Sequence, residues 1–288
     1  MSIELPKTEP GILYVVATPL GNLKDITSRA LETLQKVDLI AAEDTRTTLK
    51  LLNHFGLKGP KLISYHEHNE RERVPALINA LKEGKSIALV SEAGTPALSD
   101  PGALLVREAH KENLPVVPIP GPSALSCALS VSGFSLKDGF VFLGFLPAKV
   151  TKRRALFYEM IAEKRPLVFF EAPHRLEASL KDALDILGDR EVFLAREMTK
   201  RHEEYLLTRL SSLCQRFSQE KPRGEFTIVL AGASKSQSLH SEEKLKEALK
   251  EAFREGLSLK EVVQKVASET KAPKKLIYQL ALKIRDSL

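Results

Sequence analysis

The sequence contains few of the features that mark secreted, metal-binding or membrane proteins. Its 288 residues include only two cysteines, Cys127 and Cys214. Both lie in apolar or amphipathic stretches, which favours small core residues over a disulfide. No CxxC or Cys/His spacing predicts a zinc site, so we expect no metal. The first residues lack the basic-then-apolar pattern of a signal peptide. These absences predict a cytoplasmic protein.

Long hydrophobic runs are also missing. The most apolar region, Leu114 to Val131, is interrupted by prolines and a glycine, which predicts a strand, a loop and a helix and no membrane partner. The hydrophobic content of 43% and charged content of 28% are ordinary for a folded protein. The net charge of +6 is compatible with a polyanionic partner, but many basic proteins bind no nucleic acid.

Several nucleotide-binding and hydrolase motifs are absent as well. No GxGxxG follows the first predicted strand, which argues against a Rossmann dinucleotide site. Neither the GxxxxGK[ST] pattern of P-loop enzymes nor the GxSxG elbow of serine hydrolases occurs. The chemistry must therefore come from other loops.

Short apolar runs alternate with amphipathic stretches along most of the chain. This alternation predicts βαβ units and a mainly parallel sheet. The pattern is α/β, and we expect an N-terminal domain over 11–122 and a second one over 123–232. Asp25 is a possible N-cap for the first helix, and Pro75 a possible start for a later one. Strands are expected at 12–17, 39–42, 87–90, 116–119, 140–145, 167–170, 192–195 and 226–231.

The C-terminal part has a different pattern. Residues 233–241 are small and polar, which indicates a linker. A helical extension over 240–288 follows, in which Ser258 and Glu261 form a capping box. A basic turn at 271–275 then separates two helical stretches in a helix-turn-helix-like arrangement. A small helical cap on the second domain is the simpler interpretation, and contact of the basic turn with RNA phosphates is the alternative.

Polar or glycine-rich loops follow four of the predicted strands. In open α/β sheets, ligands bind at the carboxyl ends of the strands. The loop from Ser91 to Gly102 is so rich in Gly and Pro that function is favoured over a simple connection. The Pro/Gly turn before Ser123 precedes a helix whose first amides can hold an anion. Taken alone, the loop Thr18–Asn22 is a plain strand-to-helix turn. For Glu43–Arg46 taken alone, a surface ion cluster is at least as favoured as a catalytic role.

Taken together, the motifs resemble those of the tetrapyrrole methylase superfamily. They are TPLGNL (18–23), AAEDTR (41–46), SEAGTPALSDPG (91–102), PIPGPSA (118–124), GFLP (144–147), FFEAPHRL (169–176), LARE (194–197), RGEF (223–226) and KKLIYQLAL (274–282). The resemblance spans nearly the whole chain and is strongest to the branch that methylates small-subunit ribosomal RNA. One departure is Glu92, where the family usually has Asp.

This resemblance implies two α/β domains of the tetrapyrrole methylase type, a small C-terminal helical extension, and S-adenosyl-L-methionine in the interdomain cleft. It also implies a homodimer. From the first domain, the expected cofactor-binding residues are Thr18, Pro19, Leu20, Gly21, Asn22, Ser91, Glu92, Ala93, Gly94, Thr95, Pro96, Gly121, Pro122, Ser123 and Ala124. From the second domain, they are Phe170, Glu171, Ala195, Glu225, Phe226 and Thr227.

The resemblance also implies the reaction, which is 2′-O-ribose methylation of a cytidine in the decoding region of 16S ribosomal RNA. The partner would be that RNA or the 30S subunit. A ribose hydroxyl is a poor acid, so a proton acceptor helps. We expect Asp44 or Glu43 in that role, with Arg46 on a phosphate or base edge. The expected RNA-binding residues are Lys149, Lys152, Arg153, Arg154, His174 and Arg175.

Four alternatives stay open from the residues alone. Basic runs such as 149–154 are usually solvated faces, and His174 with Arg175 could serve only the helix start. A methyltransferase for a small tetrapyrrole-like substrate would share the fold and the cofactor. A non-catalytic RNA-binding protein is less favoured, because it would not need the cofactor loops.

Overall fold

The computed structural model describes residues 9–233, 235–270, 272 and 274–285. The chain forms two compact units. The first contains the described residues up to Cys127 together with Met198–Arg201. The second contains Ala128–Glu197 and the described residues from His202 onward. Each unit is described by itself.

The first unit is built on a parallel sheet of five strands in the order β3-β2-β4-β1-β5. Each strand has only four residues, and the central strand β4 is buried on both faces, as its run of apolar residues predicts. The strands are β1 (Leu13–Val16), β2 (Leu39–Ala42), β3 (Lys61–Ser64), β4 (Ile87–Val90) and β5 (Val116–Ile119).

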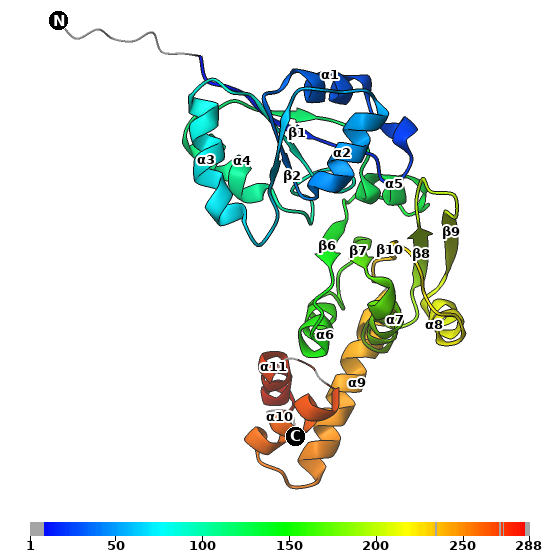
Figure 1. The fold of residues 1–288 in the computed structure, drawn as a ribbon. Coiled ribbons are helices and arrows are strands. Elements are labelled where there is room, and N and C mark those ends of the chain that lie inside the picture. Colours follow the sequence, from blue (N-terminus) through cyan, green and yellow to red (C-terminus); the bar gives the residue numbers. More distant parts are fainter. Residues whose placement is uncertain (1–8, 234, 271, 273, 286–288) are drawn as a thin grey trace, which may run out of the picture. The chain divides into compact units, whose positions relative to one another are not determined.

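Helices cover both faces of this sheet (Figure 1). Helices α1 (Ser28–Lys36) and α2 (Thr45–His54) pack on the face that contains Ala88 and Val90. Helices α3 (Glu70–Lys82) and α4 (Ala103–Lys111) pack on the opposite face. The neighbouring strands β1 and β4 therefore lead into helices on opposite faces, so a topological switch point lies between their carboxyl ends.

Local details differ from the sequence prediction. Thr27, and not Asp25, accepts the capping hydrogen bond of α1, while Asp25 lies in the short helix η1 (Leu23–Asp25). Helix α3 begins at Glu70 and contains Pro75 in its interior. Its buried apolar face on the sheet outweighs the hydrogen bond that this proline removes. Helix α2 and strand β3 are absent from the prediction, because three threonines weaken the helical pattern of α2 and β3 has only four residues.

The second unit contains a mixed sheet in the order β6-β7-β10-β8-β9. Only β6 and β7 pair in parallel, so this sheet is less parallel than the alternating pattern predicts. The strands are β6 (Val141–Phe145), β7 (Leu167–Glu171), β8 (Glu191–Arg196), β9 (Glu204–Arg209) and β10 (Phe226–Leu230). Strand β9 is absent from the sequence prediction.

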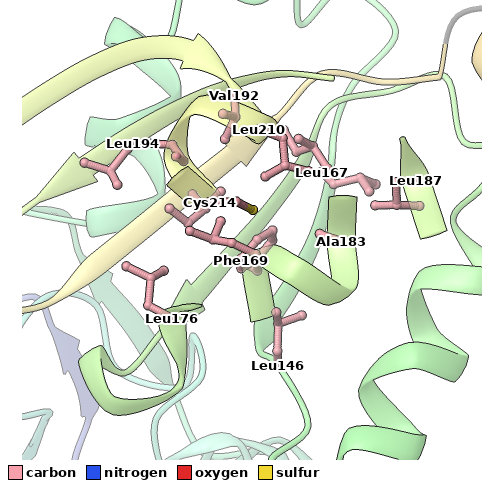
Figure 2. Close-up of a cluster of buried hydrophobic side chains, with 14 of the residues drawn as sticks. Leu146, Leu167, Phe169, Leu176, Ala183, Leu187, Val192, Leu194, Leu210 and Cys214 are labelled. Atoms are coloured by element: carbon pink, nitrogen blue, oxygen red, sulfur yellow. The ribbon is translucent and has the colours of Figure 1, made fainter. Parts of the chain in front are cut away.

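One face of the mixed sheet carries the largest hydrophobic core. Phe169 and Cys214 lie within this core, together with leucines from β7, β8 and the surrounding helices (Figure 2). The helices are α6 (Val150–Glu159), α7 (Pro173–Leu187) and α8 (Leu210–Gln219). Neither Cys127 nor Cys214 forms a disulfide, as expected. Helix α5 (Ala124–Val131) contains the point in the chain where the first unit ends and the second begins.

The chain ends in three helices that share a separate core around Leu249, Val262 and Ile277. They are α9 (Lys235–Arg254), α10 (Leu259–Thr270) and α11 (Lys274–Arg285). The predicted capping box is present, since the Ser258 amide donates to Glu261 Oε2 at 2.9 Å. The predicted linker at 233–241 is wrong, because α9 already begins at Lys235. None of the helices in the described part of the chain is long and apolar enough to span a membrane.

Candidate functional site

The loops after β1 and β4 are joined at the topological switch point. The Thr18 amide donates to the Gly94 carbonyl at 2.8 Å, and the Gly94 amide donates back to the Thr18 carbonyl at 3.0 Å. The Thr18 hydroxyl also donates to the carbonyl of Ser91 at 3.3 Å, and both side chains are buried. The two loops therefore form one backbone-lined structure where ligands bind in α/β sheets.

The loop after β5 is attached to the same structure. The Thr95 hydroxyl donates to the Pro122 carbonyl at 3.1 Å. A Cβ atom on Gly121 would lie 3.0 Å from the Cβ of Ala17, and one on Gly94, at φ +80°, would lie 3.1 Å from Leu20. Side chains at these glycines would crowd the loops. We call the joined loops 18–22, 91–96 and 121–124 the cradle. It contains all fifteen residues expected to bind the cofactor from the first domain.

The second half of the loop after β4 has unusual backbone angles. Ala97 and Ser99 have φ values of +66° and +70°, although neither is glycine. Gly102, at φ +137°, ends the segment, and a Cβ there would lie 2.8 Å from Leu89. Such conformations cost free energy and cluster at functional sites. In this loop the unusual angles occur just before Asp100, whose carboxylate forms a hydrogen bond with Ser91 at the start of the loop.

The carboxylates of Glu43 and Asp100 lie near Glu92 of the cradle, in the segments that follow β2 and β4. Glu43 Oε2 accepts a hydrogen bond of 3.1 Å from the Glu92 amide. Partial burial, followed by the negative charge of Glu43, raises the pKa of Asp100 to about 6, and the Glu92 charge adds to this. The Ser91 hydrogen bond acts in the opposite direction. Asp100 is thus suited to accept a proton near neutral pH, a role that the sequence motif alone does not reveal.

Asp44 has a different environment. Its carboxylate caps α2 by accepting from the amide of Arg46 at 2.7 Å, and it forms an ion pair of 2.8 Å with the Arg46 guanidinium. These hydrogen bonds, the Arg46 side chain first, lower the pKa of Asp44 to about 2. A carboxylate held in this way is a weak base. The expected residues Glu43, Asp44 and Arg46 do lie at the carboxyl end of β2, but Asp44 is better explained as a helix cap.

A segment distant in sequence completes the first unit. Residues Met198–Arg201 follow β8 yet cluster with the first unit. The Asn22 amide donates to Thr199 Oγ1 at 3.2 Å. A Cβ on Gly21 would lie 2.4 Å from Cγ of Lys200. Sequence reasoning misses this contact, because no residue pattern connects positions 22 and 199.

Three of the six residues expected from the second domain share one face of its sheet. Thr227 on β10 is in register with Phe170 on β7 and with Ala195 on β8. Paired residues point to the same side of a sheet. Their neighbours Phe169, Leu194 and Ile228 belong to the helix-covered core, so the row Phe170–Thr227–Ala195 lies on the other face.

Glu171, Phe226 and Glu225 are placed differently. The Phe226 side chain belongs to the core, and the fully buried Glu171 accepts hydrogen bonds from the Ala172 amide at 2.9 Å and from Ser179 at 2.5 Å. The Glu225 amide donates to Glu197 Oε1 at 2.9 Å. Glu171 therefore stabilises the start of α7, and its side chain is not available to a ligand.

The predicted RNA-binding residues also divide into two groups. Lys149, Lys152 and His174 are exposed. Arg153 is only 3% exposed and forms an ion pair of 2.6 Å with Asp182. Because an unpaired buried charge is costly, that pair is structural. The burial and the ion pair favour this structural role of Arg153 over the predicted contact with RNA.

Arg154 and Arg175 are engaged inside the second unit as well. Arg154 pairs with Asp182 at 2.8 Å and with Asp185 at 2.6 Å. Arg175 pairs with Glu171 at 2.6 Å and donates to the Leu146 carbonyl at 3.1 Å. These contacts favour a structural role for both guanidinium groups over the predicted contact with phosphates, although Arg175 Nε has no hydrogen-bond partner among the described residues. Among the described residues, no three His, Cys, Asp or Glu side chains gather as metal ligands would.

A parallel sheet with a backbone cradle at its switch point, followed by a mixed sheet, defines an α/β methylase architecture. Residues 12–214 match the family model of tetrapyrrole (corrin/porphyrin) methylases. Since this match covers more than half of the chain, the protein belongs to the tetrapyrrole methylase family.

Two relatives of this chain share about half of their aligned residues with it. The chain is 47% identical over 276 residues to a protein from Synechocystis sp. named ribosomal RNA small subunit methyltransferase I, covering 95% of this chain and 98% of the relative. A Thermotoga maritima protein with the same name is 51% identical over 222 residues, covering 77% of this chain and 99% of the relative.

Solved structures agree with the fold. Uroporphyrin-III C-methyltransferase from Thermus thermophilus, complexed with S-adenosylhomocysteine, matches with a TM-score of 0.54 and 19% identity. The match covers 76% of this chain and 97% of that one. At this identity the likeness shows the tetrapyrrole methylase fold.

Proposed function

We propose that this protein transfers a methyl group from S-adenosyl-L-methionine to the 2′ oxygen of a cytidine in the decoding region of 16S ribosomal RNA. One observation carries the proposal. The cradle is intact in a chain that aligns over 95% of its length with a relative named for small-subunit ribosomal RNA methylation. The substrate is the RNA itself or the 30S subunit.

The residues of the cradle suit S-adenosylmethionine. When bound, this cofactor supplies an activated methyl group on a positively charged sulfonium. The cradle joins the backbone of three loops at the switch point, and Glu92 within it and Glu43 and Asp100 beside it add negative charge. Such surroundings favour a cation and disfavour the pyrophosphate of a dinucleotide. Proposed contacts from the second unit are the side chains of Phe170, Ala195 and Thr227 and the backbone of Glu171, Glu225 and Phe226.

Asp100 is the proposed proton acceptor. The acceptor hydroxyl loses its proton as its oxygen forms the new bond to the methyl carbon, and the carbon–sulfur bond breaks. A carboxylate with its pKa raised to about 6 is ionised at neutral pH and is a stronger base than an ordinary Asp. The negative charges of Glu43 and Glu92 help to raise the pKa of Asp100. Asp44 caps the start of α2 and positions Arg46. The exposed Arg46 side chain is then proposed to contact the substrate.

Exposed basic residues of the second unit are proposed to contact RNA phosphates. Lys149 and Lys152 lie at the start of α6, and His174 lies at the start of α7. Phosphate contacts fix the register of a bound nucleic acid and make its affinity depend on salt. We exclude Arg153, Arg154 and Arg175 from this set because of their internal ion pairs.

The alternative of a small tetrapyrrole-like substrate rests only on the fold. Solved structures with such names are under 25% identical to this chain. The much more similar relatives are named for ribosomal RNA, which favours that substrate.

The protein is further proposed to act in the cytoplasm as a homodimer. Ribosomal RNA is a cytoplasmic substrate in bacteria, and two cysteines that form no disulfide suit a reducing compartment. Light scattering after gel filtration measures the oligomeric state, and a monomer mass at working concentration would contradict the dimer.

The reaction is tested by transfer of a labelled methyl group from S-adenosylmethionine. Purified protein is offered small-subunit particles that lack modifications, and the product is mapped by mass spectrometry. A single methyl group on one decoding-region cytidine ribose is expected. Binding of the cofactor without transfer to RNA would contradict the proposed substrate.

A further inference from the structure

Helix α11 differs in charge from the two helices that pack beside it. Helices α9 and α10 both mix acidic and basic residues, as solvated surface helices usually do. Helix α11 contains four lysines and arginines and no acidic residue. The segment 233–288 has twelve basic and eight acidic residues, so it carries four of the six net positive charges of the chain. Positive charge is thus concentrated near the C-terminus.

The exposed side of α11 also presents an aromatic residue. Tyr278 is 48% exposed, although the opposite side of the helix, with Ile277 and Ile284, is buried in the C-terminal core. Lys274 and Tyr278 are four residues apart and therefore lie one turn apart on the same side. Lys283 is also exposed, but it lies five residues beyond Tyr278 and about 140° around the helix from it, at the other edge of the exposed side. An exposed tyrosine with a lysine one turn before it is a combination that fits nucleic acid.

The C-terminal helices are fixed to the rest of the second unit. Arg154 donates to the carbonyl of Thr270, the last residue of α10, from Nε at 3.2 Å and from Nη2 at 3.0 Å. The Tyr158 hydroxyl donates to the same carbonyl at 3.1 Å. A cation at a helix C-terminus is favourable. Asp182 and Asp185 hold the guanidinium in place, so the contact orients the helices that follow.

The catalytic fold does not require these helices. The Thermotoga maritima relative is covered over 99% of its length by 222 residues, about as many as the two α/β parts contain without the C-terminal helices. The solved structures of the family likewise cover about 76–80% of this chain. Since the fold is complete at that length, an additional basic face that is firmly attached to it calls for a separate role.

We propose that the exposed side of α11, with Lys274 and Tyr278 one turn apart and Lys283 at its other edge, binds a single-stranded segment of the RNA substrate. Tyr278 stacks on an unpaired base, and the Lys274 ammonium contacts an adjacent phosphate, while Lys283 adds positive charge to the same side of the helix. The inference rests on the proposed function, because it takes RNA as the substrate. It adds a second contact region, made by residues that are not part of the cradle, that holds the RNA without taking part in the chemistry.

Substitutions in the full-length protein separate the two kinds of contact. Tyr278→Ala is expected to weaken binding of a fluorescein-labelled single-stranded RNA about 10-fold with little change in salt dependence. Tyr278→Phe keeps the ring and should restore most of that loss. Lys274→Gln should reduce the slope of log K against log salt by about 0.7, since one phosphate contact is lost. The matched control is Lys250→Gln on α9, an exposed lysine among acidic residues.

Methyl transfer distinguishes this inference from the proposed function. Tyr278→Ala should raise KM for unmodified small-subunit particles with kcat and cofactor affinity unchanged, because α11 contributes no residue to the cradle. Wild-type protein that transfers no methyl group to RNA would contradict the proposed function. Active wild-type protein with Tyr278→Ala and Lys274→Gln variants that behave like Lys250→Gln would overturn the role of α11. Loss of particle binding with unchanged affinity for protein-free RNA would also overturn it, by indicating a protein partner.

Discussion

Thr18 and Gly94 exchange two backbone hydrogen bonds, of 2.8 and 3.0 Å, across the topological switch point of the first sheet. This pair connects the loop after β1 to the loop after β4, and Thr95 then connects the second loop to the one after β5. The cradle is thus held by backbone geometry, and its shape depends on residues that tolerate unusual angles.

Gly94→Ala is therefore expected to damage the cradle. The residue has φ +80°, and a Cβ would lie 3.1 Å from Leu20. We expect a stability loss of about 1 kcal/mol from the backbone angle and at least 10-fold weaker binding of S-adenosylmethionine by calorimetry. The control is Gly56→Ala, which has φ +67° but nothing within 4 Å. It should lose similar stability and bind the cofactor normally. Equal cofactor affinity in both variants would show that the cradle does not bind it.

Asp100→Asn tests the proposed base. Wild-type kcat should rise with pH and level off above about 6, the pKa to which burial and Glu43 raise Asp100. The variant should lose about 100-fold or more in kcat and lose the pH dependence, with cofactor affinity retained. Replacement of the exposed Asp138 by Asn is the control for loss of a carboxyl. A variant with wild-type kcat would exclude Asp100 as the proton acceptor.

The same substitution has a defined effect on stability. The pKa of Asp100 is higher in the folded state, about 6, than in the unfolded chain, about 4. Between about pH 4 and pH 6 the folded state therefore binds more protons than the unfolded chain. The contribution of Asp100 to the stability of the folded state falls as pH rises through this window. Asp100→Asn removes that penalty. It should be more stable than wild type at pH 7 by on the order of 1 kcal/mol, after discounting for partial exposure, and the gain should vanish below about pH 4.

The architecture and the cradle follow well from the sequence, and the ion pairs follow poorly. The cradle is recognisable because glycines and prolines directly after buried strands are typical of loops that bind ligands. The ion pairs of Asp44 and Arg154 are not predicted, because a charged residue in a sequence does not reveal its partner. Arg154 forms a hydrogen bond with Asp182, which is twenty-eight residues away in sequence. Asp44 forms its hydrogen bonds with Arg46 only when α2 is folded. Strand β9 and the Asn22–Thr199 contact likewise depend on tertiary packing.

Asp44→Asn should retain methyl transfer within a few-fold, because Asn is also a good N-cap and the proposed base is Asp100. The pKa of Asp44 is lowered to about 2, first by the hydrogen bond with Arg46. Its stabilising effect is therefore fully present above the unfolded pKa of about 4 and is lost as pH falls towards 2. Melting curves of wild type and Asp44→Asn should differ at pH 7 and converge near pH 2. A variant that is folded and binds cofactor but is inactive would return Asp44 to the chemistry.

Neighbouring positions in the basic run of α6 should respond very differently to alanine. Arg153 is 3% exposed and is bonded to Asp182, so Arg153→Ala leaves a buried carboxylate with one partner fewer. We expect a loss of about 3–5 kcal/mol in chemical denaturation. Lys152 is exposed, and Lys152→Ala should change stability by less than about 0.5 kcal/mol. For RNA binding we expect the opposite order of effects, with the larger effect at Lys152, because Lys152→Ala should lower the salt dependence of binding. Equal stability losses at both positions would contradict the burial of Arg153, and an Arg153→Ala protein that is stable but defective in RNA binding would place Arg153 on the RNA after all.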